Sequence, residues 1–514
     1  MLQLFRKKIL RSLLLGLSGL LLVFVCTVGR ATENKTLRVA VEPVYPPFEF
    51  KAPSGDIQGF DIDIIREIGK AAGFQVEFQS IAFDGIIPAL QAKTVDAAVG
   101  AMTITAERAK AVSFSRPYFK AGVAIATLDG TQGINTIEDL AGKRVAVQIG
   151  TTGAEAIKQV PDADVRTFNA AVLTLQELSN GNVDAALSDA PVMLYAIKTG
   201  NLQGIKVNDQ LVTEELYGIP TPLNSSDLQL INQGLGTILG NGTYERLYRK
   251  WFNAQPPQLP TTAPGIETGN PARQASASVL MGSLPILLRG ALVTLQLAIL
   301  AAVLGLVAGS LIGIARLSPV APLRWLSRAY IDFFRGTPLL VQIFMVYFGL
   351  PALVQQLGFD FSFNRFFAAV LALTLNCAAY VAETVRAGIQ SIDPGQTEAA
   401  QSLGLSPNKT MRYIIFPQAI RRMLPPLGNE FISLLKDTSL VAIIGFEELF
   451  RQGQLIVAEN YRPFELYALV ALIYLVLTLL SSQVFSYLEK RMNPVQRQKA
   501  TKQVAPQETY PSAT

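Results

Sequence analysis

The chain has 514 residues, of which 50% are hydrophobic and 16% charged, a composition typical of a membrane protein rather than a soluble enzyme. Its net charge of +5 does not favour nucleic-acid binding, and the absence of histidine removes the commonest general acid–base and metal ligand. Cys26 and Cys377 lie in apolar stretches, which excludes a disulfide framework or a cysteine zinc site; the length predicts two or three domains.

The N-terminal 31 residues have the pattern of a secretory signal peptide. Arg6, Lys7 and Lys8 precede an apolar run over 13–28, and Gly29-Arg30-Ala31 offers a cleavage site with small residues. Because the apolar run is long, a retained anchor helix remains an alternative. Both interpretations predict that the residues that follow are exported.

Residues 36–252 are predicted to form an α/β domain of two lobes, because short β-rich runs alternate with helical ones. Strands are expected at 37–41, 76–80, 97–99, 144–148 and 185–187, and helices at 60–73, 86–92 and 152–159. The pattern restarts after 121–127. Extended crossings near 121–127 and 215–222 would join the lobes and leave a cleft for a small ligand.

Two features of this domain suit an amino acid ligand. Thr103, Thr105 and Arg108 place two hydroxyls and a guanidinium where a strand ends and a helix begins, which suits a carboxylate. The alternative is a helix cap with a surface arginine. Tyr45 and Phe83 stand at strand-to-loop junctions, where aromatic residues either clamp a ligand or belong to the core.

Several stretches of the domain resemble the type II periplasmic binding proteins that serve polar amino acid ABC importers, with the glutamine- and lysine/arginine/ornithine-binding members most similar. The resemblance covers the whole domain and is carried by Val41-Glu42 to Phe48-Glu49-Phe50, 59–63, 83–90, 103–108, 114–118 and 242–252.

This resemblance implies a role for each candidate residue. Arg108, with Thr103, Thr105 and the backbone at Thr151 and Thr152, holds the α-carboxylate; Asp189 takes the α-ammonium; Tyr45 and Phe83 sandwich the side chain; and Glu42 meets its far end.

Two departures from the family pattern bear on specificity. Gln148 stands where the glutamine-binding member has lysine, and Ser188 stands where it has histidine. Removing a cation while keeping Glu42 makes the pocket more negative, which favours cationic side chains. The sequence therefore predicts binding of arginine and lysine, with histidine or ornithine as further ligands and glutamine tolerated.

Residues 253–280 are rich in proline and glycine and show no hydrophobic period, so a flexible linker is expected. About 27 residues of coil reach roughly 25–30 Å. Such a tether would hold the binding domain close to the membrane at a high effective concentration.

Residues 284–490 are predicted to form an all-α membrane domain with five spans. The spans are expected within 289–316, 335–360, 365–383, 423–446 and 465–489. An odd number of spans after an exported domain leaves the C-terminus in the cytoplasm, and the basic residues flanking the spans agree with this orientation. The tail, 491–514, has no fold signal.

Three further motifs resemble the five-span permeases of polar amino acid ABC importers. They are Arg335-Gly336-Thr337-Pro338 to Gln342, Ala378-Ala379-Tyr380 with Glu383 and Arg386, and Asn429-Glu430 with Lys436 to Leu440.

Polar residues inside the spans are costly and suggest function. Asn376, Glu383 and Arg386 share one helical face by their spacing, and so do Glu430 and Asp437. Asn376, Glu383 and Glu430 are candidates for a substrate path, with Glu430 meeting a cationic substrate. The alternative, salt bridges between helices, stays open.

Residues 393–417 predict a cytoplasmic hairpin of two short helices. A helix over 394–403 should end at Gly404, and a second should run from Pro407 toward Pro417. The alternative is an ordinary loop. The motif resembles the EAA loop of ABC permeases, with Phe416 where leucine is usual. The resemblance implies that Glu398, Ala399, Ala400, Gly404 and Pro417 couple the chain to an ATPase.

The sequence contains no G-x-x-x-x-G-K-[ST] motif, so ATP with Mg²⁺ is expected on a separate ATPase subunit and no cofactor or metal in this chain. No catalytic residue is predicted. A homodimer in the bacterial inner membrane, on a dimer of ATPases, is expected, with the binding domain outside. A ligand-gated channel with a fused binding domain is the alternative, but no filter motif such as T-V-G-Y-G is present.

Overall fold

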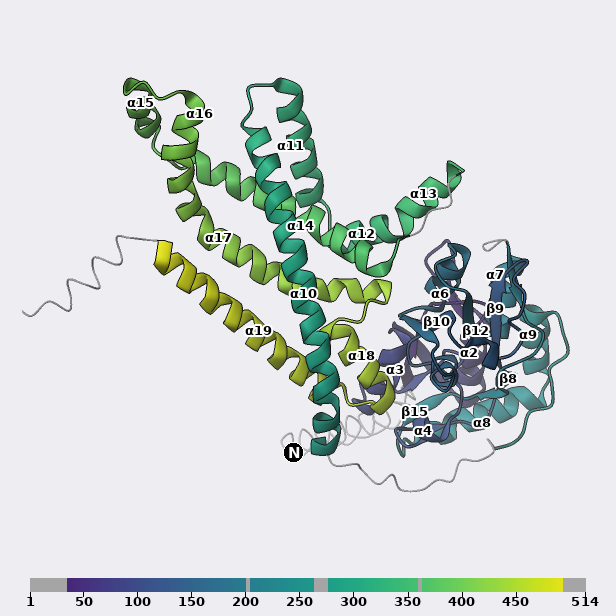
Figure 1. Ribbon diagram of the computed structural model, residues 1–514. Coiled ribbons are helices and arrows are strands. Elements are labelled where there is room, and N and C mark those ends of the chain that lie inside the picture. The colour runs from purple at the N-terminus through teal and green to yellow at the C-terminus, as the bar shows by residue number, and fades with distance from the viewer. Residues whose placement is uncertain (1–34, 200–203, 263–275, 359–362, 493–514) are drawn as a thin grey trace, which may run out of the picture.

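The computed structural model describes residues 35–199, 204–262, 276–358 and 363–492. They form an α/β domain followed by a helical domain, and Figure 1 shows the two in contact at one end of the helical domain. The predicted signal peptide, 1–31, lies outside the described residues. So does the predicted tail, except that Arg491 and Met492 continue the last helix.

The first lobe is built around the parallel sheet β5-β1-β6, with its partners in register. It contains β1 (Lys35–Val41), β2 (Val44–Tyr45), β3 (Glu49–Lys51), β4 (Ile57–Gln58), α2 (Phe60–Ala72), β5 (Phe74–Ser80), α3 (Phe83–Gln91), β6 (Ala97–Ala98), α4 (Ala106–Ala109) and β7 (Val112–Phe114), and later β15 (Pro220–Pro222), α8 (Asp227–Gly240) and α9 (Thr243–Phe252). Its core is rich in aromatic rings around Phe48, Phe60 and Phe119.

The second lobe has the five-stranded sheet β11-β10-β12-β9-β13. Its elements are β9 (Val123–Leu128), η1 (Glu138–Leu140), β10 (Arg144–Gln148), α5 (Thr152–Ile157), β11 (Asp164–Phe168), α6 (Ala171–Ser179), β12 (Ala185–Asp189), α7 (Ala190–Lys198) and β13 (Ile205–Val207). The prediction of an α/β domain is confirmed. However, the sheet is mixed rather than parallel, because β9 runs antiparallel to β12 and β13.

Two antiparallel strands carry the chain between the lobes, β8 (Phe119–Ala121) and β14 (Glu215–Tyr217). The crossings predicted near 121–127 and 215–222 are therefore located correctly, although most of 121–127 is β9 inside the second sheet. Extended crossings of this kind leave the two lobes free to approach one another around the space between them.

The helical domain begins earlier than expected. Residues 253–262 form no helix or strand, but α10 (Ser276–Arg316) starts inside the range predicted as linker, 253–280. It is followed by α11 (Ala321–Gly336), α12 (Leu339–Phe344), the π-helix η2 (Met345–Gly349), α13 (Leu350–Gln356), α14 (Arg365–Gln390), α15 (Pro394–Ser402), α16 (Pro407–Thr410), the π-helix η3 (Met411–Ile415), α17 (Phe416–Asp437), η4 (Thr438–Ile444), α18 (Leu449–Asn460) and α19 (Pro463–Met492).

Within the described residues, three helices are long and apolar enough to cross a membrane: Val279–Arg316, Arg365–Gln390 and Pro463–Met492. A fourth span results if the bent pair Ala321–Gly336 and Leu339–Val354 counts as one. The predicted span 423–446 falls on α17 and η4, which carry Glu430, Lys436 and Asp437 and do not qualify by composition. The count of five therefore stays a prediction.

The predicted second span, 335–360, falls on α12, η2 and α13, and a break in the chain lies at its start. The chain bends by 108° between α11 and α12. Thr337 has extended backbone angles of φ −117° and ψ 145° before Pro338, because a residue before proline avoids the helical region. Residues 321–336, which lie outside the predicted spans, form the first half of this bent helix pair, and 339–354 form the second half.

The α10–α14 pair forms the centre of the helical domain, and glycines on α10 make its close approach possible. A Cβ atom at Gly309 would lie 2.6 Å from the Ala378 carbonyl oxygen, and one at Gly313 would lie 2.6 Å from that of Ala382. Small residues let helices pack backbone to backbone where lipid supplies no hydrophobic driving force.

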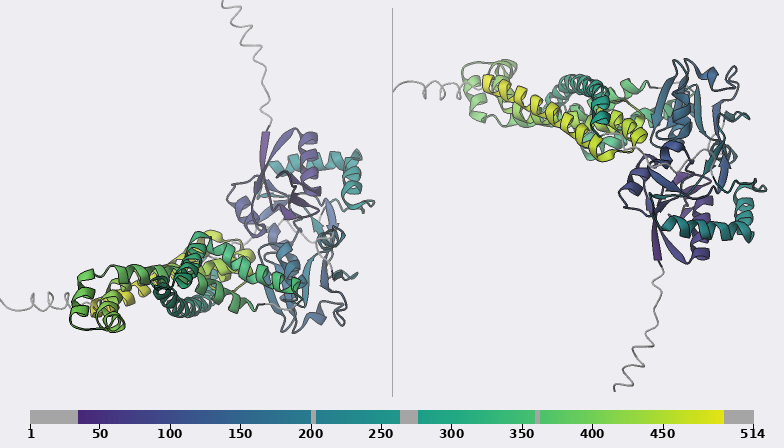
Figure 2. Two further views of the ribbon diagram at one scale, coloured as in Figure 1. Left: turned by 90° about the horizontal axis from the view of Figure 1, so that it is seen from above. Right: turned by 90° about the horizontal axis from the view of Figure 1, so that it is seen from below.

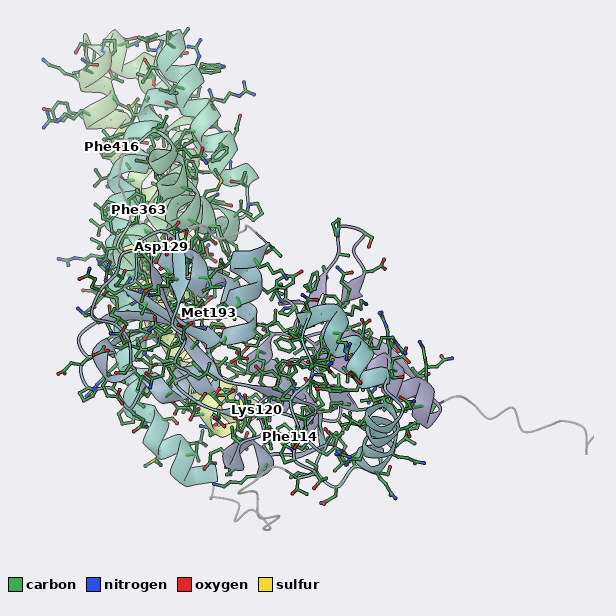
Figure 3. All side chains as sticks on the ribbon, turned by 90° about the vertical axis from the view of Figure 1, so that its right-hand side faces the viewer. Phe114, Lys120, Asp129, Met193, Phe363 and Phe416 are labelled. Atoms are coloured by element: carbon green, nitrogen blue, oxygen red, sulfur yellow. The ribbon has the colours of Figure 1, made fainter. Side chains whose placement is uncertain are left out.

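The two helices predicted on either side of Gly404 in the hairpin at 393–417 are present, but the second continues through η3 into α17 instead of ending near Pro417. Asp393 caps α15 by accepting a hydrogen bond from the Gly395 N–H, and Gly404 adopts φ +78° between α15 and α16. Figure 1 shows this hairpin at the end of the helical domain far from the α/β domain, and Figure 3 shows Phe416 near the same end. Glu398 and Ala399 are exposed, whereas Ala400 is buried.

Candidate functional site

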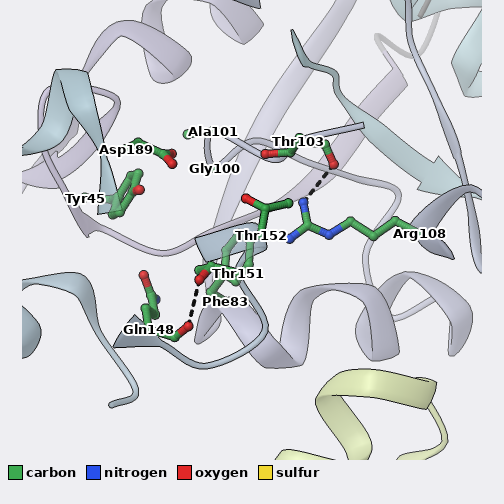
Figure 4. Close-up of a pocket in the computed structure, with 10 residues that line it drawn as sticks. All are labelled: Tyr45, Phe83, Gly100, Ala101, Thr103, Arg108, Gln148, Thr151, Thr152 and Asp189. Atoms are coloured by element: carbon green, nitrogen blue, oxygen red, sulfur yellow. Dashed lines mark hydrogen bonds between the residues drawn. The ribbon is translucent and has the colours of Figure 1, made fainter. Parts of the chain in front are cut away.

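A pocket lies between the two lobes. It is lined by Tyr45, Phe83, Gly100, Ala101, Thr103, Arg108, Gln148, Thr151, Thr152 and Asp189 (Figure 4). Eight of these ten were singled out from the sequence, whereas Glu42 and Thr105 do not line the pocket.

The fold explains why residues so far apart in sequence meet here. Gln148 ends β10 and Asp189 ends β12, which are neighbours in the parallel part of the second sheet. Carboxyl ends of parallel strands share one edge, and ligands bind in the crevice beyond that edge. The first lobe contributes Thr103 and Arg108 from the segment after β6. Each lobe thus presents polar groups to the same space.

Arg108 occupies one side of the pocket and is 4% exposed. Its Nη1 donates to the Thr103 carbonyl at 2.7 Å, and its Nη2 donates across the cleft to the Gly150 carbonyl at 3.0 Å. Its guanidinium lies 5.4 Å from the Phe83 ring centroid. The alternative of a surface arginine is therefore wrong, although Thr105 does cap α4 by accepting from the Arg108 backbone N–H.

Acidic groups lie opposite Arg108 and are buried. Figure 4 shows Asp189 beside Tyr45, on the far side of the pocket from Arg108. Burial, reinforced by the Glu215 carboxylate, raises the pKa of Asp189 to about 7, although the Tyr217 hydroxyl donates to it. At neutral pH a cation bound beside Asp189 therefore shifts this carboxyl to its ionised form.

Glu42 lies directly behind the pocket wall. Its carboxylate accepts hydrogen bonds from Gln148 Nε2 at 2.7 Å and from the Phe83 backbone N–H at 3.1 Å. Burial raises the pKa of Glu42 to about 7 against these two hydrogen bonds. Because Gln148 belongs to the second lobe and Glu42 to the first, their bond also holds the lobes together.

The aromatic residues Tyr45 and Phe83 do not divide simply into core residues and residues that clamp a ligand. Tyr45 lines the pocket, but it also belongs to the core of the first lobe, stacking 6.3 Å from Phe48. Its hydroxyl lies 3.5 Å from Ser188 Oγ in the second lobe. Phe83 is partly buried at the start of α3.

Sequence reasoning missed two lining residues, Gly100 and Ala101. Ala101 adopts φ +46°, an unusual conformation for a residue with a side chain, and its N–H donates to Asp61 at 2.8 Å. The available signal was their position at the end of a strand just before Thr103, where a glycine permits close backbone approach.

The polar residues of the helical domain do not form one cluster. Asn376 donates to Gln342 Oε1 at 3.0 Å, which ties α14 to α12. Glu383 pairs with Arg386 within α14, so the expected alternative of a bridge between helices is not what this pair forms. In the part of the chain that the structure describes, no hydrogen bond reaches the side chain of Glu430, which is half-buried on α17.

In the same described residues, no group of three or more His, Cys, Asp or Glu side chains could hold a metal ion. The buried Cys377 is a free thiol.

Comparison with known proteins places both domains. The family described as "Bacterial extracellular solute-binding proteins, family 3" matches residues 37–254, and "Binding-protein-dependent transport system inner membrane component" matches residues 301–494. The chain is 43% identical over 215 residues to the glutamine transport system permease protein of Escherichia coli K12, which covers 42% of this chain and 96% of that protein.

Two further similarities were found. The chain is 38% identical over 215 residues to the arginine transport system permease protein of Bacillus subtilis 168, covering 42% of this chain and 96% of that protein. A solved ancestral arginine-binding protein bound to arginine is 42% identical, with a TM-score of 0.41, and covers 42% of this chain and 98% of its own. The chain therefore belongs to the inner-membrane permease family of amino acid ABC importers, and it carries a solute-binding domain and a permease domain in one polypeptide.

Proposed function

We propose that this chain is the receptor and translocation subunit of an ATP-driven importer whose main substrates are cationic amino acids. Arginine and lysine are the expected ligands, with histidine or ornithine as further ligands and glutamine tolerated. The single observation that carries this proposal is the pocket between the lobes, where buried Arg108 faces the buried carboxyl of Asp189 and Glu42 lies behind the wall.

The arrangement suits an α-amino acid with a cationic side chain. Arg108 can pair with the α-carboxylate and Asp189 with the α-ammonium, as their placement on opposite sides of the pocket suggests. Glu42 is then available for the far end of the ligand once Gln148 shifts. The neutral Gln148 and Ser188 add no positive charge, so the balance of the pocket favours a cation.

The names of the relatives are compatible with two substrates, since one transports glutamine and another arginine. We assign glutamine the weaker binding because its neutral amide can donate a hydrogen bond to Glu42 but carries no charge to pair with the ionised carboxylate. The membrane residues Asn376, Glu383 and Glu430 would form part of the route through the helical domain, and uptake unaffected by Glu430→Gln would remove that residue from the path.

The energy for transport would come from a separate ATPase subunit that binds the α15–α16 hairpin. The residues Glu398, Ala399, Ala400, Gly404 and Pro417 would form the contact. Leu403 at its tip is 83% exposed and offers an apolar side chain to a partner. Two copies of the chain on two ATPase subunits would enclose the path. The distance of the hairpin from the α/β domain supports an external receptor and a cytoplasmic motor.

The experiment that tests this proposal is calorimetry on the purified full chain with arginine, lysine, glutamine and glutamate. We expect arginine and lysine to bind most tightly, glutamine more weakly, and glutamate not measurably. Glutamate binding more tightly than arginine would contradict the charge argument. Binding of none of the four would contradict the proposed substrate class.

A further inference from the structure

The binding domain contacts its own permease domain, and the two lobes contact it differently. Figure 2 shows the α/β domain beyond one end of the helical domain in both views. Two contacts join the second lobe to the permease domain. Tyr347 Oη on η2 donates to Glu177 Oε2 on α6 at 2.7 Å, and both side chains are completely buried. Lys158 forms an exposed ion pair with Glu459.

The first lobe meets the permease at α18 and the start of α19, as far as the described residues show. Helix α18 packs against α3. Tyr461, in the left-handed conformation at φ +55°, ends α18 and packs against the hydrophobic cluster of the first lobe that contains Ile86 and Leu90. Its hydroxyl interacts with Arg108, the arginine of the pocket.

Arg451 on α18 lies where the two lobes and the permease come together, and it is 0% exposed. From the second lobe, Thr167 Oγ1 accepts a hydrogen bond from its Nη2 at 3.0 Å, and Asn169 Oδ1 accepts one from its Nη1. From the first lobe, Asp84 supplies the leading favourable charge on Arg451. A Cβ at Gly150 would lie 3.7 Å from Ala458 and 3.8 Å from Asp84, so lobe, lobe and permease meet here.

Keeping the charge of Arg451 buried is unfavourable unless both lobes supply its partners. Burial lowers the pKa of Arg451 to about 10. The positive charge of Arg365 lowers this pKa as well, whereas the negative charge of Asp84 raises it. Its Nε–H is buried without a hydrogen-bond partner among the described residues. Removing one partner of a buried charge is strongly destabilising. If the first lobe swung away, Arg451 would lose Asp84 while remaining in contact with Thr167.

We propose that Arg451 detects closure of the binding domain: its site is complete only when both lobes are together, so docking of the domain and closure around a ligand stabilise one another. The contact is also connected to the pocket. The side chain of Asn169 binds Arg451, and its backbone carbonyl accepts a hydrogen bond from Gln148 Nε2 at 3.2 Å. The same Gln148 nitrogen donates to Glu42. This inference rests on the proposed function only in that the domain closes around an amino acid.

A test measures docking directly in the full chain. Lys158→Cys and Glu459→Cys, made with Cys26→Ala and Cys377→Ala, place two exposed thiols at the docked interface for a short bifunctional maleimide. The lost ion pair is exposed and contributes little. The chain is reconstituted in nanodiscs with its ATPase, and cross-linking is followed with and without saturating L-arginine, while calorimetry on the same protein records binding.

The expected results differ between two kinds of variant. In the parent protein L-arginine increases the docking equilibrium, by about 5- to 150-fold if the coupling is of ordinary size. In Arg451→Gln the yield becomes independent of L-arginine, and Asp84→Asn on the opposite side of the site gives the same result. The matched control Tyr347→Phe weakens a contact to the second lobe only, so it lowers the yield but keeps the response to L-arginine.

The outcomes separate this inference from the proposed function. L-arginine binding with an unchanged response in Arg451→Gln, or loss of the response in Tyr347→Phe to the same degree, would overturn the inference alone. If calorimetry shows binding of L-glutamine but not L-arginine, the cross-linking is judged with L-glutamine and only the preferred substrate is revised. A chain that binds neither amino acid would overturn the proposed function and this inference with it.

Discussion

At the scale of single residues, specificity depends on charges that have been removed from water. Glu42 and Asp189 are buried on opposite sides of the lobe boundary, and burial moves the pKa of each to about 7. The α-ammonium of any amino acid stabilises ionised Asp189, whereas only a cationic side chain adds a charge that stabilises ionised Glu42. The same pair of carboxyls therefore makes affinity depend on both the charge of the ligand and the pH.

Replacing Glu42 tests the first consequence. We expect Glu42→Gln to lower the affinity for arginine by about tenfold or more. The variant loses the attraction between the buried carboxylate and the cationic side chain of the ligand, which contributes at least about 1.4 kcal/mol. The affinity for glutamine should change less. Calorimetry on both ligands measures this, with Glu67→Gln, in an exposed ion pair with Lys70 on α2, as the control. Equal losses for both ligands would assign Glu42 a structural role only.

The pH dependence of binding tests the second consequence. With the pKa of both carboxyls near 7, the empty pocket takes up protons as the pH falls below 7, and a cationic ligand must displace them. Arginine affinity should therefore fall on acidification, by about tenfold per pH unit for each carboxyl that must ionise. Binding isotherms at pH 8 and pH 5.5 should show a steeper loss for arginine, which needs both carboxyls ionised, than for glutamine, whose α-ammonium needs only Asp189 ionised.

At the scale of elements, α10 packs against α14 both through a shared hydrophobic cluster and through close backbone approach at glycines. Gly309 faces the Ala378 carbonyl with no room for a side chain, whereas Gly282 on the same helix has open space. These two glycines make a matched pair, because an added methyl group raises helix propensity equally at both.

We expect Gly309→Ala to destabilise the helical domain by about 1–3 kcal/mol through overpacking, and to lower its melting temperature. Gly282→Ala should be neutral or slightly stabilising, since alanine is favoured over glycine within a helix. Thermal unfolding of both variants in the same detergent makes the comparison. A stable Gly309→Ala protein would show that α10 and α14 can move apart at little cost.

At the scale of the whole molecule, the pocket and the α15–α16 hairpin lie at opposite ends, so events at one must reach the other through the helical domain. The hairpin turns at Gly404, whose φ of +78° excludes most side chains. Strain at this turn should therefore disturb coupling without affecting the receptor.

Accordingly, Gly404→Val should leave arginine binding unchanged while reducing ATP-dependent arginine uptake in proteoliposomes by tenfold or more, an order-of-magnitude expectation for a misplaced coupling contact. Gly240→Ala, at a helical glycine with open space in the α/β domain, serves as the control. Uptake at the parent rate by Gly404→Val would argue against a motor contact at this hairpin.

The sequence by itself determined most of the local structure and most of the pocket. Alternating strands and helices predicted both lobes, and proline and glycine marked the hairpin, because these signals act over a few residues. Eight pocket residues were found through motifs carried on such elements. Gly100 and Ala101 were missed because neither has a polar or aromatic side chain that would mark it as a ligand contact.

Only the tertiary structure decided which distant groups meet. It folded α11 back through the bend at Pro338, joined Gln148 to Glu42 across the cleft, and placed Arg451 against Asn169, which is 282 residues away in the sequence. The cost of burying a charged group depends on everything packed around it, from all segments at once. No local pattern in the sequence of α18 contains that information.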